Sequence, residues 1–256
     1  MRILYLIIFT TFLFLVPKTI RAQKMIGDIV YKASVPKSFS LLKKQKGVKT
    51  SEAVKNTTIS LDNAIKKNIG KISYKLVFNE NEAHYKLNST LGSDEGFGIE
   101  AAKIATGAFS SYYFNIPNNQ VLKQTEAYGQ LFLISSDLNA RKWILTQESK
   151  TIGSYLCYKA TSTLVTKNSV GTFYKPVIAW YAPKLPVPYG PNGYGGLPGL
   201  IMQLKERNIT FYVSKLTLNP KKEIKIRRPT KGKKVTQEEF EKIGEKSKLN
   251  FVKMRN

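Results

Sequence analysis

Side chains that commonly do catalytic chemistry are scarce in this chain. His84 is the only histidine and Cys157 the only cysteine among 256 residues. A hydrolytic triad needs an imidazole beside a nucleophile, and most zinc sites need several nitrogen or sulfur ligands together. We therefore predict no catalytic residue, no metal site, no cofactor and no internal disulfide. His84 is expected to lie on the surface or to pack on a strand, and Cys157 to be a buried, inert thiol. A Cys157–His84 dyad and a disulfide to a partner protein stay open as alternatives.

Acidic side chains leave one enzymatic alternative open. Cleavage of a glycosidic bond needs two carboxyl groups that face each other across the substrate. Five glutamates could converge in the folded chain, although nothing in their spacing singles out two of them: Glu82, Glu95, Glu100, Glu126 and Glu148. A carboxylate-based periplasmic hydrolase is therefore the alternative to a binding function.

A segment rich in proline and aromatic residues is the best candidate for a binding surface. Prolines restrict the unfolded chain, so such a loop can stay ordered without regular hydrogen bonding. Aromatic rings held on it would offer flat apolar faces with a polar tip to a ligand or partner. The predicted contact residues are Trp180, Tyr181, Tyr189, Tyr194, Leu197 and Pro198. The other interpretation is that these aromatic residues plug the open end of a sheet and belong to its core.

The end of this segment combines strong backbone constraints with an apolar tract. Pro198 fixes its own φ, and Gly199 can take a positive φ without strain. The sequence Leu197-Pro198-Gly199-Leu200 is therefore predicted to form a type II turn with proline at its second position and glycine at its third. A mostly apolar strand is expected to follow from Leu200.

The hexapeptide at residues 196–201 resembles the signature of the GLPGLI family of exported bacterial proteins. Further similarity lies in Trp143, in residues 150–161 and 179–183, and in the Gly-x-Ile-x-Tyr opening at residues 27–31. The resemblance implies export in a Gram-negative bacterium, to the periplasm or the outer membrane. It supplies no catalytic residues and no established reaction.

The first 22 residues are typical of a cleaved signal peptide. Arg2 gives a basic start, residues 3–16 form an apolar run too short for an ordinary membrane span, and Ala22 offers a cleavage site. No cysteine follows that could carry a lipid. We expect a periplasmic or secreted protein, with an uncleaved anchor as the alternative.

The chain is strongly basic, with a formal net charge of +24. An exported basic protein meets anionic lipid and polysaccharide more often than nucleic acid, and no nucleic-acid-binding motif is present. The predicted partners are therefore an outer-membrane protein or an anionic lipid or polysaccharide, and not nucleic acid. A simpler reading is that the lysines keep a β-rich protein soluble and protect its strand edges.

Alternating apolar and polar residues predict a mainly β fold. We expect a curved antiparallel sheet, half-open barrel or sandwich-like, curled around a helix or folded on itself, with one or two short packing helices. Short helices are predicted at 61–69, capped by Ser60, and at 99–106. The expected strands are 27–35, 72–78, 83–88, 110–116, 120–128, 130–135, 142–147, 153–163, 172–182, 200–204 and 209–217.

The chain divides by composition into a signal peptide at 1–22, a β-rich domain at 23–218 and a basic C-terminal extension at 219–256. Thr236 and Glu239 have the spacing of a capping box, which predicts a helix over 236–246 within this extension. The function expected for the whole is that of an exported, non-catalytic envelope protein. It would bind an apolar or amphipathic ligand or an outer-membrane partner; a purely architectural role in the envelope is a further alternative.

Overall fold

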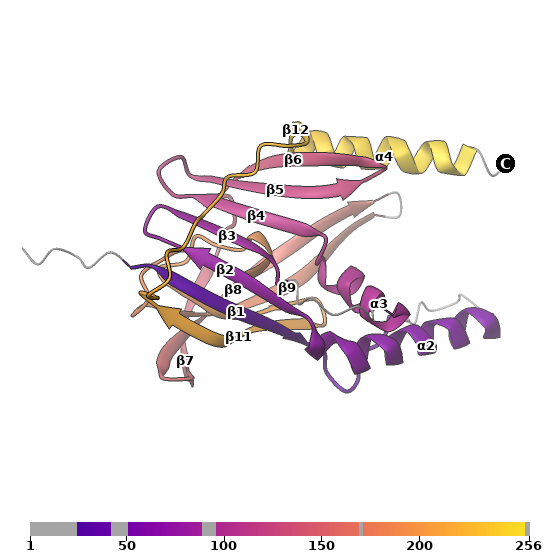
Figure 1. Ribbon diagram of the computed structural model, residues 1–256. Coiled ribbons are helices and arrows are strands. Elements are labelled where there is room, and N and C mark those ends of the chain that lie inside the picture. Colours follow the sequence, from indigo (N-terminus) through magenta and orange to yellow (C-terminus); the bar gives the residue numbers. More distant parts are fainter. Residues whose placement is uncertain (1–24, 42–50, 89–95, 169–170, 254–256) are drawn as a thin grey trace, which may run out of the picture.

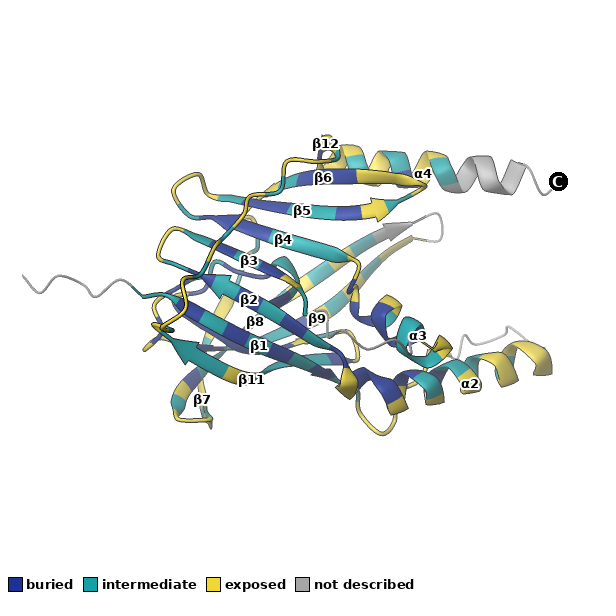
Figure 2. Cartoon of the chain, viewed as in Figure 1, coloured by how far each residue is buried: buried dark blue, intermediate teal, exposed yellow. Residues whose placement is uncertain are grey.

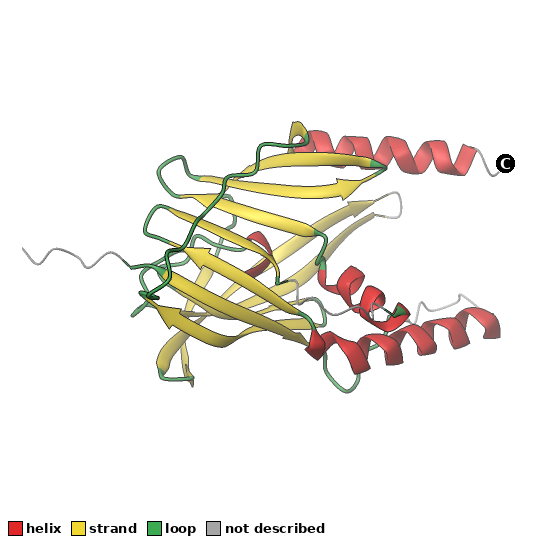
Figure 3. Ribbon diagram, in the orientation of Figure 1, coloured by secondary structure: helices red, strands yellow, loops and turns green. Residues whose placement is uncertain are grey.

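One curved, open sheet of twelve strands forms the body of the protein (Figures 1 and 3). The computed structural model describes residues 25–41, 51–88, 96–168 and 171–253. The expected signal peptide lies outside these ranges. The strand order across the sheet is β12-β6-β5-β4-β3-β2-β1-β11-β10-β9-β8-β7. The strands are β1 (Gly27–Ser34), β2 (Ser73–Phe78), β3 (Glu82–Leu87), β4 (Ser110–Asn115), β5 (Gln120–Ala127), β6 (Gln130–Asp137), β7 (Ile144–Ile152), β8 (Tyr155–Asn168), β9 (Gly171–Ala182), β10 (Leu200–Glu206), β11 (Ile209–Leu218) and β12 (Lys233–Thr236).

The prediction of a mainly β fold with a curved antiparallel sheet is confirmed. Consecutive strands pair as hairpins on both sides, and β1 joins the two halves because it pairs antiparallel with both β2 and β11. The strand alternation works as expected in β1, where Ile29, Tyr31 and Ala33 are fully buried on the concave face. Figure 2 shows the same alternation of buried and less buried residues along the neighbouring strands.

Helices lie at the ends of the sheet and do not fill its centre (Figure 1). Helix α2 (Glu52–Asn68) continues into a short 3-10 turn, η1 (Ile69–Lys71), and packs against α3 (Phe97–Thr106). Helix α2 begins nine residues earlier than the prediction that placed its cap at Ser60. Ser51 is the actual cap, and its hydroxyl accepts a hydrogen bond from the backbone N–H of Val54. Its second half carries Ile65, which is buried in the core.

The concave side of the sheet is occupied by the loop of residues 183–199, between β9 and β10. Tyr189 packs between Phe78 of β2 and Phe114 of β4, with ring centroids 5.7 and 5.5 Å away. The hydroxyl of Tyr189 donates a hydrogen bond to the carbonyl O of Asn79 at 3.2 Å. The expectation that the sheet would curl around a helix is therefore wrong. It curls around this loop, whose prolines and glycines allow an irregular backbone path.

The turn at Leu197–Leu200 also differs from the prediction. The N–H of Gly199 donates to the carbonyl O of Leu197 at 2.8 Å, which closes a three-residue turn around Pro198. The N–H of Leu200, which a type II turn would direct at Leu197, instead donates to Leu185 O at 2.9 Å. Gly199 does take a positive φ, of 157°, as predicted. Long-range pairing within the loop thus replaces the local hydrogen bond of the predicted turn.

The C-terminal segment wraps around one edge of the sheet. Residues 219–232 cross its outer face (Figure 1), where Ile226 packs on a cluster of Tyr113, Leu122 and Leu133. Strand β12 then pairs in parallel with β6. Helix α4 (Gln237–Lys253) follows, and the predicted capping box is present: Glu239 N–H donates to Thr236 Oγ1 at 3.2 Å, and Thr236 N–H donates to Glu239 Oε2 at 2.7 Å.

Candidate functional site

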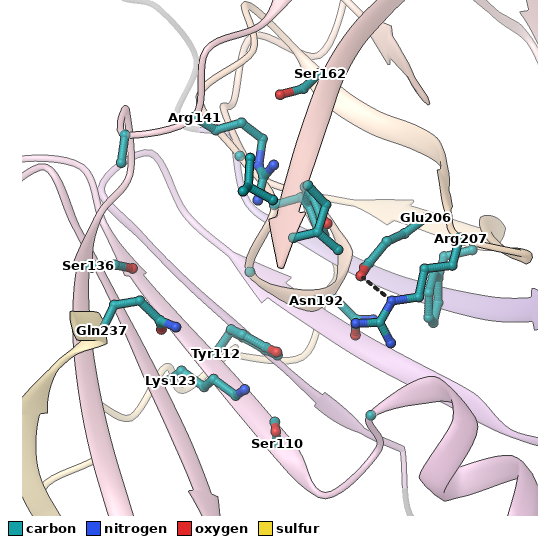
Figure 4. A pocket seen from close by; sticks show the side chains of 18 of the residues that line it. Ser110, Tyr112, Lys123, Ser136, Arg141, Ser162, Asn192, Glu206, Arg207 and Gln237 are labelled. Atoms are coloured by element: carbon teal, nitrogen blue, oxygen red, sulfur yellow. Dashed lines mark ion pairs between the residues drawn. The ribbon is translucent and has the colours of Figure 1, made fainter. Parts of the chain in front are cut away.

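The open side of the curved sheet contains a cavity of about 1040 Å³ (Figure 4). One wall comes from β4, β5 and β6, and the other from β7, β8 and the β10–β11 turn. The end of α3 and the start of α4 contribute to its margin, and the loop 183–199 contributes Tyr194 and Gly195. Ligand pockets in proteins are typically about 300–1,000 Å³. This cavity is therefore large enough for a small organic ligand.

Arg141 and Tyr194 form a stacked pair in the cavity wall. The guanidinium carbon of Arg141 lies 4.3 Å from the centroid of the Tyr194 ring, a cation–π contact. Tyr194 is itself buried, and Trp143 packs beside it with ring centroids 6.3 Å apart. The contact restricts where the guanidinium lies, while its N–H groups can still donate hydrogen bonds. Figure 4 shows the group directed into the cavity.

Lys123 enters the cavity from the facing wall. It lies on β5 directly opposite Tyr112 of β4, and its Nζ is 5.9 Å from the Tyr112 ring centroid. Burial lowers the pKa of Lys123, although the negative charge of Glu206 partly opposes that shift. The side chain is thus a partly desolvated cation at the cavity surface.

Glu206 is a carboxylate that lines the same cavity. It pairs with Arg207 in the same turn, at 3.7 Å between Nε and Oε1. Burial raises the pKa of Tyr112 and Tyr194 well above the ordinary value, and the charge of Glu206 adds to both shifts. Both phenols therefore stay protonated at physiological pH and can act as hydrogen-bond donors.

Aliphatic side chains stand exposed at the margin of the cavity. Ile104 of α3 is 70% exposed, Ile144 of β7 is 68% exposed and Val165 of β8 is 48% exposed, and all three line the cavity. Exposed apolar groups around a concave site are typical of ligand or membrane contacts. The cavity therefore combines a charged and phenolic interior with an apolar rim.

The six predicted contact residues are not brought together on a surface. Tyr181, Tyr189, Tyr194 and Leu197 are buried, as the plug interpretation of the loop requires. Trp180 is half-buried with Lys150 Nζ 4.2 Å above its ring, and Pro198 is exposed. Of the six, only Tyr194 lines the cavity. These aromatic residues turn inward because the concave face offers a large apolar surface that the loop must cover.

The sequence analysis missed Lys123, Arg141 and Glu206. One signal for Lys123 was present: it lies in the row of Val121 and Thr125, both buried, so strand alternation points its side chain to the interior. A lysine in an inward-facing row is unusual for a core position. Arg141 and Glu206 carried no comparable signal, since both lie at or beyond the end of a strand.

The carboxylates considered for hydrolysis do not converge. Glu82 accepts a hydrogen bond from Tyr113, Glu100 pairs with Lys103 within α3, and Glu148 pairs with Lys159 between β7 and β8. Glu126 is exposed on β5, and Glu95 lies outside the described residues. None of the four described glutamates lines the cavity.

Cys157 and His84 have the surroundings that the sequence suggested. Cys157 is fully buried, and burial raises the pKa of its thiol to about 11. His84 lies on β3, paired in register with Val77 and Tyr113, and its Nε2 is buried without a hydrogen-bond partner in the described structure. Within the described ranges, no three residues among His, Cys, Asp and Glu are grouped as metal ligands would be.

Together these features define a mainly β protein whose half-open sheet encloses an inserted loop and a polar cavity with an apolar rim. A family described as "Protein of unknown function (Porph_ging)" matches residues 167–203. The match spans β9, the loop 183–199 and the start of β10, the region that carries most of the resemblance noted in the sequence. The chain is thus similar in part to a family of unknown function, and the GLPGLI assignment stays a prediction.

Two crystal forms of PNGF-II are similar in structure, each with a TM-score of 0.49 and 14% sequence identity. The similarity covers 85% of this chain and 32% of that one, so the chain spans about a third of the length of PNGF-II. No curated protein matches in sequence. Among the described helices, none combines the length and apolar character required to cross a bilayer.

Proposed function

We propose that this chain is an exported, non-catalytic protein that binds an amphipathic ligand in the cavity of its half-open sheet. The observation that carries the proposal is the distribution of side chains around the 1040 Å³ cavity. Charged and phenolic groups lie inside it, whereas Ile104, Ile144 and Val165 stand exposed at its rim. A ligand with a polar head and an aliphatic chain would satisfy both regions, because burial of its chain would cover the exposed rim.

The loop 183–199 supports this function by giving the cavity a rigid floor. Trp143 Nε1 donates to Gly195 O at 2.9 Å, and the ring of Tyr189 is held between two core aromatic residues. A preformed cavity binds with a smaller loss of conformational entropy than one that must be assembled. The rigid loop thus contributes to binding as the floor of the cavity, rather than through an exposed aromatic surface.

The location and partners we propose follow from the sequence. A basic protein in the periplasm, or released from the cell, would meet anionic lipid and outer-membrane proteins, which could supply or receive the ligand. The expected signal peptide and the formal charge of +24 support this placement.

The rim offers a matched pair of variants for the test. Ile144 lines the cavity, and its neighbour Leu145 is 53% exposed but does not line it. We expect laurate, monolauroylglycerol or dodecyltrimethylammonium, titrated below micelle formation, to give saturable binding by calorimetry. Ile144→Asp should weaken that binding by about tenfold, whereas Leu145→Asp should leave it unchanged. If none of the three single-chain amphiphiles binds the unaltered protein, the proposed function is wrong.

A further inference from the structure

Two cations of the cavity lack a carboxylate partner. Neither Arg141 nor Lys123 forms an ion pair within the described part of the chain; each instead contacts an aromatic ring. Glu206, a carboxylate of the same cavity, pairs with Arg207, and its charge also favours the charged form of Lys123 without forming an ion pair with it. The cavity is also lined by Asp137 and Glu241. Arg141 comes from the segment after β6 and Lys123 from β5, and Figure 4 shows both charged ends directed toward the interior of the cavity.

An unpaired cation in a partly desolvated site is unfavourable for the protein alone. Removal of a charge from water costs free energy unless a counter-charge or hydrogen bonds replace the lost solvation. Burial already lowers the pKa of Lys123, because removal from water disfavours the charged form of the side chain. An anionic group bound close to Lys123 would offset this cost and would restore the pKa of Lys123 toward its ordinary value.

The groups next to the two cations are also suited to an anion. Tyr112 lies beside Lys123 and Tyr194 beside Arg141, and the raised pKa of each phenol keeps its O–H protonated; Tyr112 also interacts with Ser110 and Tyr194 with Glu206. A guanidinium presents its N–H groups in a planar fork that matches two oxygens of a carboxylate or phosphate.

We propose that the head of the ligand is an anionic oxygen group, a carboxylate or a phosphate monoester, attracted by the positive charges of Arg141 and Lys123 that both line the cavity, with an aliphatic chain along the rim. This inference rests on the proposed function and names the chemical class of its ligand. The shared chemistry is a compact anion on a single chain, as in a fatty acid or an alkyl phosphate.

Four probes separate head recognition from chain recognition. Laurate and dodecyl phosphate carry the two anionic heads, monolauroylglycerol carries a neutral head on the same acyl chain, and inorganic phosphate is an anion without a chain. By calorimetry, we expect one or both anionic amphiphiles to bind about tenfold or more tightly than monolauroylglycerol, and inorganic phosphate to bind far more weakly than dodecyl phosphate. Whichever of laurate and dodecyl phosphate binds more tightly identifies the head.

Variants of the two cations test the assignment directly. Arg141→Gln and Lys123→Met each remove one charge but keep a side chain of similar length. We expect each to reduce affinity for the anionic amphiphiles by about tenfold and to leave affinity for monolauroylglycerol unchanged. Lys184→Gln is the control, because this exposed lysine does not line the cavity and its replacement removes the same charge. Thermal unfolding of each variant verifies that the fold persists, and Arg141→Lys tests whether charge without the planar fork suffices.

The outcomes distinguish the proposal of an anionic head from the proposed amphiphile-binding function on which it rests. Equal affinity for laurate, dodecyl phosphate and monolauroylglycerol, unaltered by Arg141→Gln and Lys123→Met, would overturn the anionic head while leaving amphiphile binding intact. If inorganic phosphate bound as tightly as dodecyl phosphate, the proposal that an aliphatic chain of the ligand contributes to binding would be overturned. If no amphiphile bound to the protein, the proposed amphiphile-binding function itself would be contradicted.

Discussion

The indole Nε1 of Trp143 donates a hydrogen bond to the backbone carbonyl O of Gly195 at 2.9 Å. This bond ties the segment between β6 and β7 to the loop 183–199, whose neighbouring residue Tyr194 lies under Arg141. The segment that leads into β7 and the loop at the floor of the cavity are thus joined through one side chain. Its geometry explains how an irregular loop keeps a fixed position inside the sheet.

Trp143→Phe should therefore loosen the cavity floor. The substitution keeps much of the aromatic packing but leaves the carbonyl of buried Gly195 without its donor, which costs about 1–3 kcal/mol in free energy of unfolding. Urea unfolding would measure this loss. Tyr174→Phe, at an exposed position of β9, is the control and should change stability by less than about 0.5 kcal/mol. Equal stability of the two variants would contradict a structural role for the bond.

Two glycines with similar φ values allow the cost of backbone strain to be distinguished from the cost of a steric clash. Gly107 ends α3 with φ of 71° and Gly193 has φ of 76°, so alanine is strained at both. A Cβ at Gly107 would meet no atom within 4 Å, whereas one at Gly193 would lie 2.4 Å from Cδ1 of the Tyr112 ring.

We expect Gly107→Ala to cost about 1 kcal/mol and Gly193→Ala about 2–4 kcal/mol, because the second must also displace a packed ring. Chemical denaturation of the two variants gives the comparison. A cost for Gly193→Ala no larger than that for Gly107→Ala would show that the loop does not press against Tyr112.

Helix α4 is predicted to be held on the sheet mainly by Phe240. Its ring meets Phe132 edge-on, with centroids 5.1 Å apart, and also contacts Tyr128. Phe240→Ala should release α4 and β12 at a local cost of about 2–4 kcal/mol, seen as faster amide hydrogen exchange in residues 233–246. Glu245→Ala, exposed on the same helix, should leave the exchange rates unchanged. Unaltered exchange in Phe240→Ala would place the anchor elsewhere.

Cys157 should be unreactive while the protein is folded. Burial raises the pKa of its thiol to about 11, so the thiolate is scarce near neutral pH and access is blocked as well. At about pH 8, we expect alkylation by iodoacetamide to be about 100-fold slower in the folded protein than in concentrated guanidinium chloride. Rapid labelling of the folded protein, without unfolding, would favour the alternative of a reactive Cys157–His84 dyad.

The stability of the protein should fall in mild acid through His84. Burial, with the charge of Lys86 beside it, lowers the pKa of this imidazole below its ordinary value of 6.5. The unfolded chain therefore takes up the proton more readily, and the free energy of unfolding decreases as pH falls below about 6.5. His84→Gln should flatten the pH dependence of urea unfolding in that window, while carboxylate titration at lower pH stays common to both proteins. Superimposable profiles would show that His84 does not contribute.

The sequence determined the local structure well. Alternation of apolar and polar residues places a strand within a few residues at almost every predicted position, because side chains on a strand alternate between two faces of which one is buried. The capping box at Thr236 and Glu239 predicted the start of α4, since its two hydrogen bonds join residues three apart. The short parallel strand β12 had no such signal. It begins with two lysines, Lys233 and Lys234, so its sequence shows no alternation of apolar and polar residues.

Only the tertiary structure decided where the aromatic loop lies and what the cavity contains. The sequence left open whether Tyr189 and Tyr194 belong to a core or to a surface, since an aromatic ring on an irregular segment has no periodicity to assign it a face. Pairing of β1 with β11, almost two hundred positions later in the chain, bends the sheet so that the loop is enclosed. The same bend places Lys123 and Arg141 on the wall of one cavity, an arrangement that depends on sheet curvature rather than on any local pattern of residues.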